Sequence, residues 1–330
     1  MFHTTKDTLL YVLCPGYYKT GGTELAHQLV SEVNSQGGKA YIVYYDNAEK
    51  GINPEFTKYT NNFITLKDVV DNKDNIIIAP EIIPEILNSY KHIQKSVWWM
   101  SVDNFTKNRG LLNVLKYYGV LNGIKLILRG KATIVNGKID KKIAHLYQSE
   151  YAKIFLKKRG ASRIARLSDY INDIYIDKHN SQAKKEDVVL YNPKKGYAIT
   201  KKIIKNSPDI TWIPLQNMTN TQVCQLLHGS KVYIDFGNHP GKDRFPREAA
   251  ISGCSIITNK NGSAANDVDI PINDNYKFDK PYNIQKITAQ IRTCLNDYDR
   301  TIADFNQYRQ TILNEKRIFK EDVNKLFITK

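Results

Sequence analysis

The stretch that decides the fold of this 330-residue chain is residues 235–250, Asp-Phe-Gly-Asn-His-Pro-Gly-Lys-Asp-Arg-Phe-Pro-Arg-Glu-Ala-Ala. An apolar strand ends at Phe236, and a loop with two glycines follows it. Pro246 then suits the first turn of a helix, where its missing N–H costs nothing. Strand, glycine loop and helix in this order are the repeating unit of a parallel α/β sheet.

The loop in this stretch combines backbone flexibility with positive charge. Gly241 permits a close backbone approach, and Lys242, Arg244 and Arg247 stand at the start of the expected helix. Free N–H groups, the helix dipole and cationic side chains together predict an anion site, with a solvated basic turn as the alternative. Glu248, expected in the first helical turn, either accepts bonds from ribose hydroxyls or only offsets the dipole.

The same rhythm of strands and helices extends outward over the whole chain. Short apolar runs predict strands at residues 9–13, 40–45, 76–79, 96–102 and 144–147, and again at 188–191, 210–215, 232–236 and 254–258. A polar stretch at 177–186 without apolar periodicity separates the two groups. We therefore expect two doubly wound Rossmann-like α/β domains facing a cleft, with domain bounds at 1–176 and 187–283 and a helical tail at 284–330 that crosses back to the first domain.

Composition narrows the class of partner. Lys and Arg number 48 against 33 Asp and Glu, which gives a formal net charge of +15. Phosphate groups, nucleic acid and an anionic membrane face all suit such a surplus. The four cysteines lack zinc-ligand or disulfide-framework spacing, and no signal peptide or transmembrane run is evident. We therefore expect a cytoplasmic protein, which could also bind peripherally to the inner face of the membrane.

The helix after the basic loop resembles the nucleotide-sugar half of GT-B glycosyltransferases, especially retaining enzymes of the family 4, or group 1, type. Their hallmark is two glutamates separated by seven residues, then Ala and Gly before a strand. The run from Glu248 to Gly253 matches the second half, whereas the first glutamate falls on Pro240. The resemblance implies a GT-B fold, a nucleotide-sugar donor held by the second domain, and Glu248 on the donor ribose.

Further segments carry the same resemblance. Gly22, after the first strand, is similar to the family's glycine loop near the donor phosphate, but it also suits an ordinary tight turn. Lys194 and Lys195 follow the first strand of the second domain, where the family places a basic pair against the diphosphate; a solvated Lys-Lys turn is the alternative. Ser263 lies in a loop that lines the donor pocket by resemblance or is a plain loop.

Two residues are candidates for catalysis. Asp103 follows the strand at 96–102 and would act as a base near the acceptor hydroxyl, unless it only caps the next helix. His239 would touch the sugar or a phosphate oxygen, unless it is a plain turn histidine. Lys and Arg aimed at the leaving phosphate would stabilise its charge, so no metal and no further cofactor is expected.

The sequence therefore predicts a metal-independent glycosyltransferase that acts on a glycan or a lipid-linked glycan, in surface polysaccharide synthesis. Residues 107–131 mix basic and apolar side chains and would lie on an anionic membrane, or else form a core helix pair with a wet face. Three other hypotheses remain open. They are a glycosyltransferase of modified DNA bases, a non-catalytic nucleic-acid or glycan-binding protein, and a nucleotide-sugar epimerase on the same fold.

Overall fold

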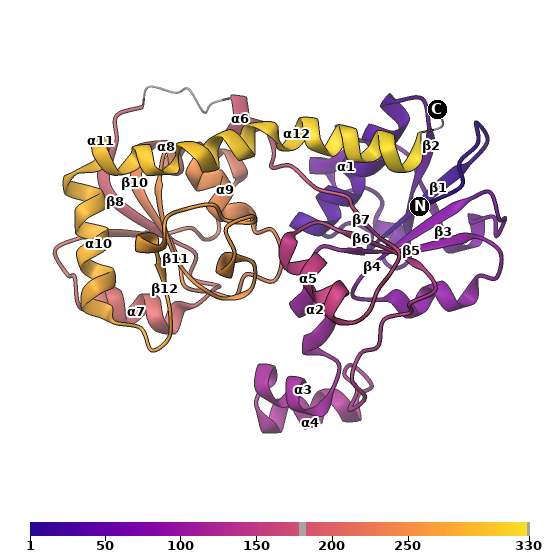
Figure 1. Ribbon diagram of the computed structural model, residues 1–330, viewed down its shortest axis with the longest axis horizontal. Helices are drawn as coiled ribbons and strands as arrows, with labels where there is room; N and C mark the ends of the chain where they lie inside the picture. Colours follow the sequence, from indigo (N-terminus) through magenta and orange to yellow (C-terminus); the bar gives the residue numbers. More distant parts are fainter. Residues whose placement is uncertain (178–182, 329–330) are drawn as a thin grey trace. The chain divides into compact units, whose positions relative to one another are not determined.

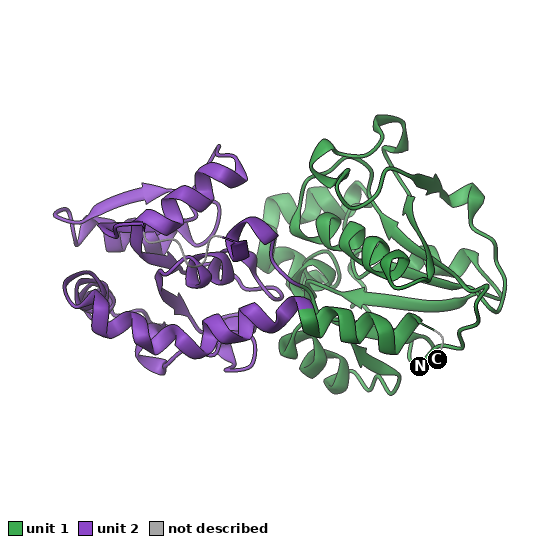
Figure 2. Ribbon diagram, turned by 90° about the horizontal axis from the view of Figure 1, so that it is seen from above, with its two compact units in different colours: residues 1–169, 317–330 green, residues 170–316 purple. Residues whose placement is uncertain are grey.

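The computed structural model describes residues 1–177 and 183–328, and the chain divides into two compact units. Unit 1 consists of residues 1–169 with 317–330, and unit 2 consists of residues 170–316 (Figure 2). The boundary at residue 169 precedes the linker expected at 177–186, of which 178–182 lie outside the described residues. Each unit is built around its own parallel sheet, as the sequence predicts (Figure 1).

Unit 1 contains a seven-stranded sheet in the order β3-β2-β1-β4-β5-β6-β7. Its inner strands are buried on both faces, as in β4, because helices cover a parallel sheet from both sides. The strand order reverses between β1 and β4, which makes their carboxyl ends the topological switch point. The strands are β1 (Leu9–Cys14), β2 (Lys39–Tyr44), β3 (Phe63–Thr65), β4 (Ile76–Pro80), β5 (Gln94–Trp99), β6 (Ala144–Tyr147) and β7 (Ile164–Arg166).

Unit 2 contains a five-stranded parallel sheet in the order β12-β11-β10-β8-β9. The order reverses between β8 and β10, which are neighbours in the sheet although β9 lies between them in the chain. Ligands of such sheets bind beside the carboxyl ends of the two strands at this point. The strands are β8 (Glu186–Tyr191), β9 (Thr211–Pro214), β10 (Ser230–Asp235), β11 (Ser255–Asn259) and β12 (Lys277–Phe278).

The helices follow the expected order with some changes in bounds. Gly119, which has a φ of +74°, separates the two helices at Leu111–Tyr118 and Val120–Leu128, and Pro84–Ser89 form the 3-10 helix η4. The remaining α-helices of unit 1 are α1 (Gly21–Ser35), α2 (Val102–Lys107), α3 (Leu111–Tyr118), α4 (Val120–Leu128) and α5 (Glu150–Lys158). Those of unit 2 are α6 (Asp173–Asp177), α7 (Tyr197–Lys205), α8 (Asn220–Gly229), α9 (Arg244–Ile251), α10 (Ile284–Asn296) and α11 (Tyr298–Thr301).

The long helical tail is confirmed, but it is not one continuous helix. After α10 and α11, a 3-10 turn at Ile302–Phe305 leads into the 22-residue helix α12 (Asn306–Phe327). The buried side chains of α12 recur at helical spacing and include Tyr308, Ile312, Phe319 and Val323. Among the described residues, none of the helices combines the length and the apolar character that crossing a bilayer requires.

Candidate functional site

The candidate site of unit 2 is formed by the loops that follow β8 and β10, on both sides of its switch point. We call residues 192–196 and 236–243 the switch-point loops. The first leads into α7 and the second into α9, so both loops end at a helix N-terminus. Helix N-termini beside a parallel sheet favour anionic ligands, because the backbone N–H groups and the helix dipole point toward them.

Two glycines allow the switch-point loops to lie in backbone contact. Gly196 has a φ of +63°, and a Cβ built there would lie 2.3 Å from the carbonyl carbon and oxygen of Phe236. A Cβ built on Gly237 would lie 2.6 Å from the Cβ of Lys195. Real Cβ atoms do not approach this closely, so no larger residue fits at either position without a shift of the backbone. The close contact fixes how the two loops are placed relative to each other.

A third loop, after β11, holds the carbonyl oxygens of the second switch-point loop. The Ser263 backbone N–H donates to the His239 carbonyl at 2.8 Å, and the Ser263 hydroxyl donates to the Gly241 carbonyl at 2.6 Å. The Asn259 side-chain amide donates to the Gly237 carbonyl at 2.7 Å. Ser263 is fully buried, so the structure places it beneath the loop, in the position of a support.

His239 lies between two carboxylates in the interior of the site. Its Nδ1 is 3.0 Å from Oδ2 of Asp243, and its Nε2 is 3.8 Å from Oδ1 of Asp235. The ring is fully buried. Burial lowers the pKa of His239, but the close contact with the Asp243 carboxylate and the charges of both aspartates outweigh it and raise that pKa above its usual value. The structure therefore favours a positively charged imidazolium here.

Lys195 completes this buried charge network. Its Nζ lies 2.9 Å from Oδ2 of Asp243, the same oxygen that faces His239. Burial raises the pKa of Asp243, but His239 and Lys195 outweigh this and hold that pKa below its usual value. Asp243 is the N-cap residue of α9 yet makes no side-chain capping bond there, because its carboxylate is directed to the two cations.

The network also has the ligand types of a metal site. Asp235, His239 and Asp243 each offer a ligand atom, and these atoms lie within 4.8 Å of one another. The Lys195 ammonium, however, already supplies a positive charge to Asp243 at 2.9 Å. The arrangement is that of an internally paired ion network, and the expectation of metal independence stays a prediction.

A second ion cluster lies under the loop and uses a residue that the sequence analysis missed. Glu315, on α12, lies 2.8 Å from Nη1 of Arg247 and 2.8 Å from Nζ of Lys242. Arg247 also donates to the carbonyls of Lys242 and Asp243, at 2.9 and 3.1 Å. Arg247 is fully buried and Glu315 is 2% exposed, so this pairing fastens the loop to α12. The sequence does contain a signal for this pair, because Glu315 lies within the apolar stripe of the helical tail. A carboxylate buried there needs a cationic partner.

The other predicted residues of this site differ in access to solvent. Lys194 is exposed, and Arg244 is the first residue of α9 and half-buried. Glu248 is 7% exposed. Because α9 begins at Arg244, Glu248 lies in the second helical turn and not in the first turn, where the sequence placed it. Gly241 is buried in the loop, where its carbonyl accepts the bond from Ser263.

The predicted residues of unit 1 lie near the carboxyl ends of β1 and β5. Gly22 is in the first turn of α1, and a Cβ built there would lie 3.6 Å from the sulfur of Met100. Asp103 is half-buried near the start of α2 and accepts a bond from the Tyr151 hydroxyl at 3.0 Å. The N-cap of α2 is Ser101, so the alternative in which Asp103 caps this helix is wrong.

A buried carboxyl group at the same sheet edge was not expected from the sequence. Glu81 follows β4 directly, is 2% exposed, and accepts a bond from the Met100 backbone N–H at 3.1 Å. Burial raises the pKa of Glu81 to about 7, against the lowering effect of its backbone hydrogen bonds. Glu81 therefore joins the ends of β4 and β5 and titrates near neutral pH.

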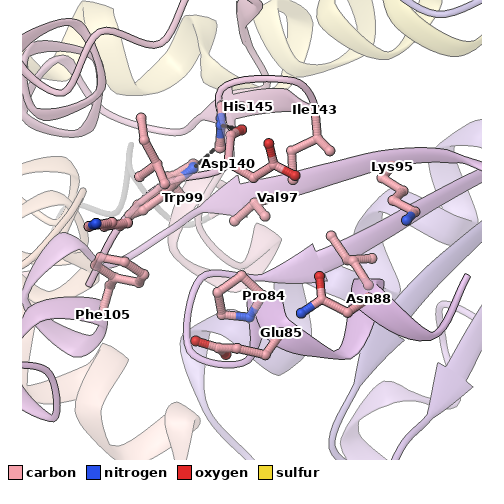
Figure 3. Close-up of a pocket in the computed structure, with 13 residues that line it drawn as sticks. Pro84, Glu85, Asn88, Lys95, Val97, Trp99, Phe105, Asp140, Ile143 and His145 are labelled. Carbon is pink, nitrogen blue, oxygen red and sulfur yellow. Dashed lines mark hydrogen bonds between the residues drawn. The ribbon is translucent and has the colours of Figure 1, made fainter. Parts of the chain in front are cut away.

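Unit 1 also contains a cavity of about 160 Å³ on the face of its sheet (Figure 3). Its floor includes Val97 and Trp99 of β5, and its rim carries both acidic and basic side chains, among them Glu85 and Lys95. His145 is held in one tautomer, because its Nδ1 accepts from the Trp99 indole at 3.0 Å while its Nε2 lies 3.0 Å from the Asp140 carbonyl. None of the site residues predicted from the sequence lines this cavity.

Comparison with known proteins identifies the architecture. No protein-family model and no curated protein sequence matches the chain. The structure of HepE from Anabaena, in complex with UDP-glucose, matches with a TM-score of 0.59 at 13% identity over 97% of this chain and 99% of that one. WaaG, a glycosyltransferase involved in lipopolysaccharide biosynthesis, matches with a TM-score of 0.59 at 12% identity over 95% and 99%. The fold is GT-B.

A third similar structure contains DNA. An α-glucosyltransferase in complex with UDP and a 13-mer DNA containing an HMU base matches with a TM-score of 0.51 at 10% identity over 96% of this chain and 99% of that one. Identities this low establish the fold alone. The expected GT-B architecture is therefore confirmed, and the reaction is inferred from the site.

Proposed function

We propose that the chain is a glycosyltransferase that moves a sugar from a nucleotide-sugar donor to a glycan or a lipid-linked glycan, without a metal. The observation that carries the proposal is the site at the switch point of unit 2. There, two glycine-dependent loops end at helix N-termini, and they contain three lysines against one carboxylate, that of Asp243. GT-B structures similar to this chain contain UDP-glucose or UDP.

The donor diphosphate would bind at the exposed side of the switch-point loops. Lys194 is exposed and Arg244 lies at the N-terminus of α9, so these two side chains are the proposed direct contacts of the diphosphate. Loss of the nucleoside diphosphate builds negative charge on its leaving oxygen, and fixed cations there stabilise the transition state. Lys242 and Lys195 are proposed to add to this positive field, while their carboxylate partners keep them in position.

The buried residues are proposed to hold the site in shape. Arg247 anchors the loop to α12 through Glu315, and Ser263 supports the loop carbonyls from below. His239, as an imidazolium between two aspartates, is proposed to contribute its charge from beneath the donor and not as a proton carrier. Glu248 is proposed to hold the donor ribose through its carboxylate.

The acceptor is proposed to bind to unit 1, at the carboxyl ends of β1 and β5. Gly22 leaves room for close backbone approach, and Asp103 is proposed as the group that accepts the proton of the acceptor hydroxyl. Surface polysaccharide synthesis in the cytoplasm, at the inner face of the membrane, is the proposed setting. The lipopolysaccharide role of WaaG, a similar structure, accords with it.

The test is donor binding measured by thermal unfolding with UDP, GDP, CDP, ADP and dTDP in turn. One nucleotide should raise the unfolding temperature, because a ligand of the folded state stabilises it by RT ln(1 + [L]/Kd). Glu248→Gln should remove the shift. The matched control is Glu186→Gln, the same change at the opposite end of the same sheet, which should keep it.

Donor turnover completes the test. The donor in this experiment is a sugar conjugate of the nucleotide that stabilises the protein. Slow hydrolysis of this donor should be detectable by mass spectrometry, and EDTA should not abolish it. Absence of a shift with all five nucleotides, or a shift that Glu248→Gln leaves unchanged, would sink the donor-site assignment. Turnover abolished by EDTA would contradict metal independence.

A glycosyltransferase of modified DNA bases is a second candidate, favoured by one similar GT-B structure and by the charge of +15. It predicts tight binding to a duplex that contains a hydroxymethylated base, with a steep loss of affinity as salt rises. It also predicts sugar transfer to that duplex. DNA binding equal for modified and unmodified duplexes, without transfer, would exclude this candidate.

A further inference from the structure

A helical hairpin of unit 1 carries an unusual charge pattern. We define the basic hairpin as residues 107–135, which contain α3 and α4 and the loop after them. Between Asp103 and Asp140 the sequence has no acidic residue at all. The stretch between these two aspartates contains the cations Lys107, Arg109, Lys116, Lys125, Arg129, Lys131 and Lys138. Its positive charge is therefore not offset from within the segment.

The basic hairpin also exposes a large apolar face. Leu112 on α3 is 84% exposed, and Leu121 and Leu128 on α4 are 78% and 81% exposed. Val114 is the buried residue of α3 and Gly123 that of α4. The alternative of a core helix pair is therefore wrong, because the apolar side chains of both helices face mainly outward.

The outward apolar residues of α4 follow a helical period. Leu121, Ile124 and Leu128 are spaced at i, i+3 and i+7, so they form one stripe along the helix, and all three are exposed. Lys125 and Arg129 follow Ile124 and Leu128 directly and border this stripe. On the inner side, a Cβ built on Gly123 would lie 3.0 Å from Leu115, so the glycine lets α4 pack closely on α3. Figure 1 shows the pair projecting from the rest of unit 1.

The chemistry of this surface selects its partner. An amphipathic helix with an aliphatic face and a basic border suits the interface of an anionic bilayer, where the face enters the acyl boundary and the cations meet lipid phosphates. A second copy of the chain would bring an identical positive hairpin and be repelled. Nucleic acid would meet aliphatic leucines, which neither stack on bases nor bond to phosphates.

We propose that the basic hairpin is a docking surface for an anionic lipid bilayer, with α3 and α4 lying in the plane of the interface. The hairpin also lies beside the proposed acceptor residue, because Asp103 belongs to α2, and α2 contacts α3. Docking would thus bring a lipid-linked acceptor close to Asp103. This acceptor link rests on the proposed function, whereas the docking itself does not.

The test is co-sedimentation of the full chain with vesicles of phosphatidylcholine, with or without phosphatidylglycerol. Binding should require phosphatidylglycerol and weaken with salt. Leu121→Gln with Leu128→Gln should lower the partition constant by roughly tenfold or more per leucine. Lys125→Gln with Arg129→Gln should lower it by roughly fivefold per charge on anionic vesicles.

Matched controls distinguish binding through the basic hairpin from non-specific apolar adsorption and from an effect of net charge. Val70→Gln and Val268→Gln change exposed apolar residues outside the hairpin, and Lys202→Gln with Lys205→Gln removes two exposed cations of α7. All of these should bind vesicles as the original chain does. Thermal unfolding of each hairpin variant should match the original chain, which shows that it folds.

Three results would overturn the proposal. They are no binding to anionic vesicles, equal binding by the leucine variant, or a hairpin-dependent self-association or acidic-protein complex in the absence of lipid. Donor binding is measured separately, as the nucleotide-dependent shift in unfolding temperature of the same protein preparations without vesicles. Failure of the docking proposal and failure of the proposed function are therefore distinguishable.

Discussion

The switch-point loops of unit 2 and the basic hairpin of unit 1 use positive charge in opposite ways. In the loops, Lys195, Lys242 and Arg247 each face a carboxylate at 2.8–2.9 Å in a mostly buried setting. In the hairpin, Lys125 and Arg129 are exposed on a segment without acidic residues. Buried and paired charges organise a backbone, because an unpaired charge there is costly; exposed and uncompensated charges are available to a partner.

The two regions also use glycine differently. Gly196, in the first switch-point loop, combines a positive φ with a backbone contact that excludes a Cβ. Gly119, between α3 and α4, has a φ of +74° but no atom within 4 Å of an added Cβ. The loop glycine is therefore required by packing as well as by conformation, and the hairpin glycine by conformation alone.

The largest expected effect follows from this difference. Gly196→Ala should destabilise the protein by about 4 kcal/mol or more, because the new Cβ collides with the Phe236 backbone. Gly119→Ala should cost less, about 1–3 kcal/mol, which is the penalty for the positive φ and extended ψ of this residue. Chemical denaturation measures both. Equal losses in the two variants would show that the close contact between the loops is not a constraint.

The next effect concerns the carboxylate under the loop. Glu315→Gln should cost about 3 kcal/mol, because it removes a buried negative charge that faces both Arg247 and Lys242 at 2.8 Å. Glu321→Gln, on the exposed side of the same helix, should change stability by less than about 0.5 kcal/mol. Denaturation of both variants at neutral pH is the measurement. A small loss at Glu315 would mean that the cations are stabilised by other contacts.

A smaller effect is expected in the dependence of stability on pH. The pKa of His239 is raised in the folded state, so its contribution is complete below its unfolded pKa of about 6.5 and is lost as pH rises through the folded value. His239→Gln should flatten the fall in unfolding free energy over that window. His3→Gln, at an exposed position, should leave the profile unchanged. A profile that is the same in both variants would show that His239 is neutral throughout.

The smallest effect is expected in the basic hairpin. Lys125→Gln with Arg129→Gln should change the free energy of unfolding by less than about 0.5 kcal/mol, because neither side chain is buried. The same variant should bind anionic vesicles more weakly, as proposed above. A clear loss of stability would contradict the contrast with the loops, since it would show that these cations are structural.

Much of the fold was predictable because its signals are local. A short apolar run, a glycine loop and a helix start lie within 16 residues at 235–250, and the observed β10, loop and α9 follow that order. The position of the α9 start was not predictable to the residue. Asp243, the observed N-cap, is of a residue type that favours this position, but the neighbouring glycine loop and Pro246 favoured a later start. The break at Gly119 was predictable because glycine tolerates the positive φ found there.

The pairing within the candidate site was not predictable in the same way. Arg247 and Glu315 are 68 residues apart, and no local pattern indicates that they meet. The basic hairpin shows a related limit. Its amphipathic sequence fits a helix that buries its apolar face as well as one that exposes it, because periodicity defines a face but not its neighbour.

By itself, the sequence determined the parallel α/β units, the glycine loops at their strand ends and the excess of positive charge. These follow from residue types close together in the chain, which set backbone conformation and the alternation of buried and exposed positions. Only the tertiary structure decided which cations are paired and buried, such as Arg247, and which remain exposed, such as Lys125. Burial and charge pairing depend on elements that folding brings together from distant parts of the chain, and those contacts decide whether a charge supports the fold or is free to bind a partner.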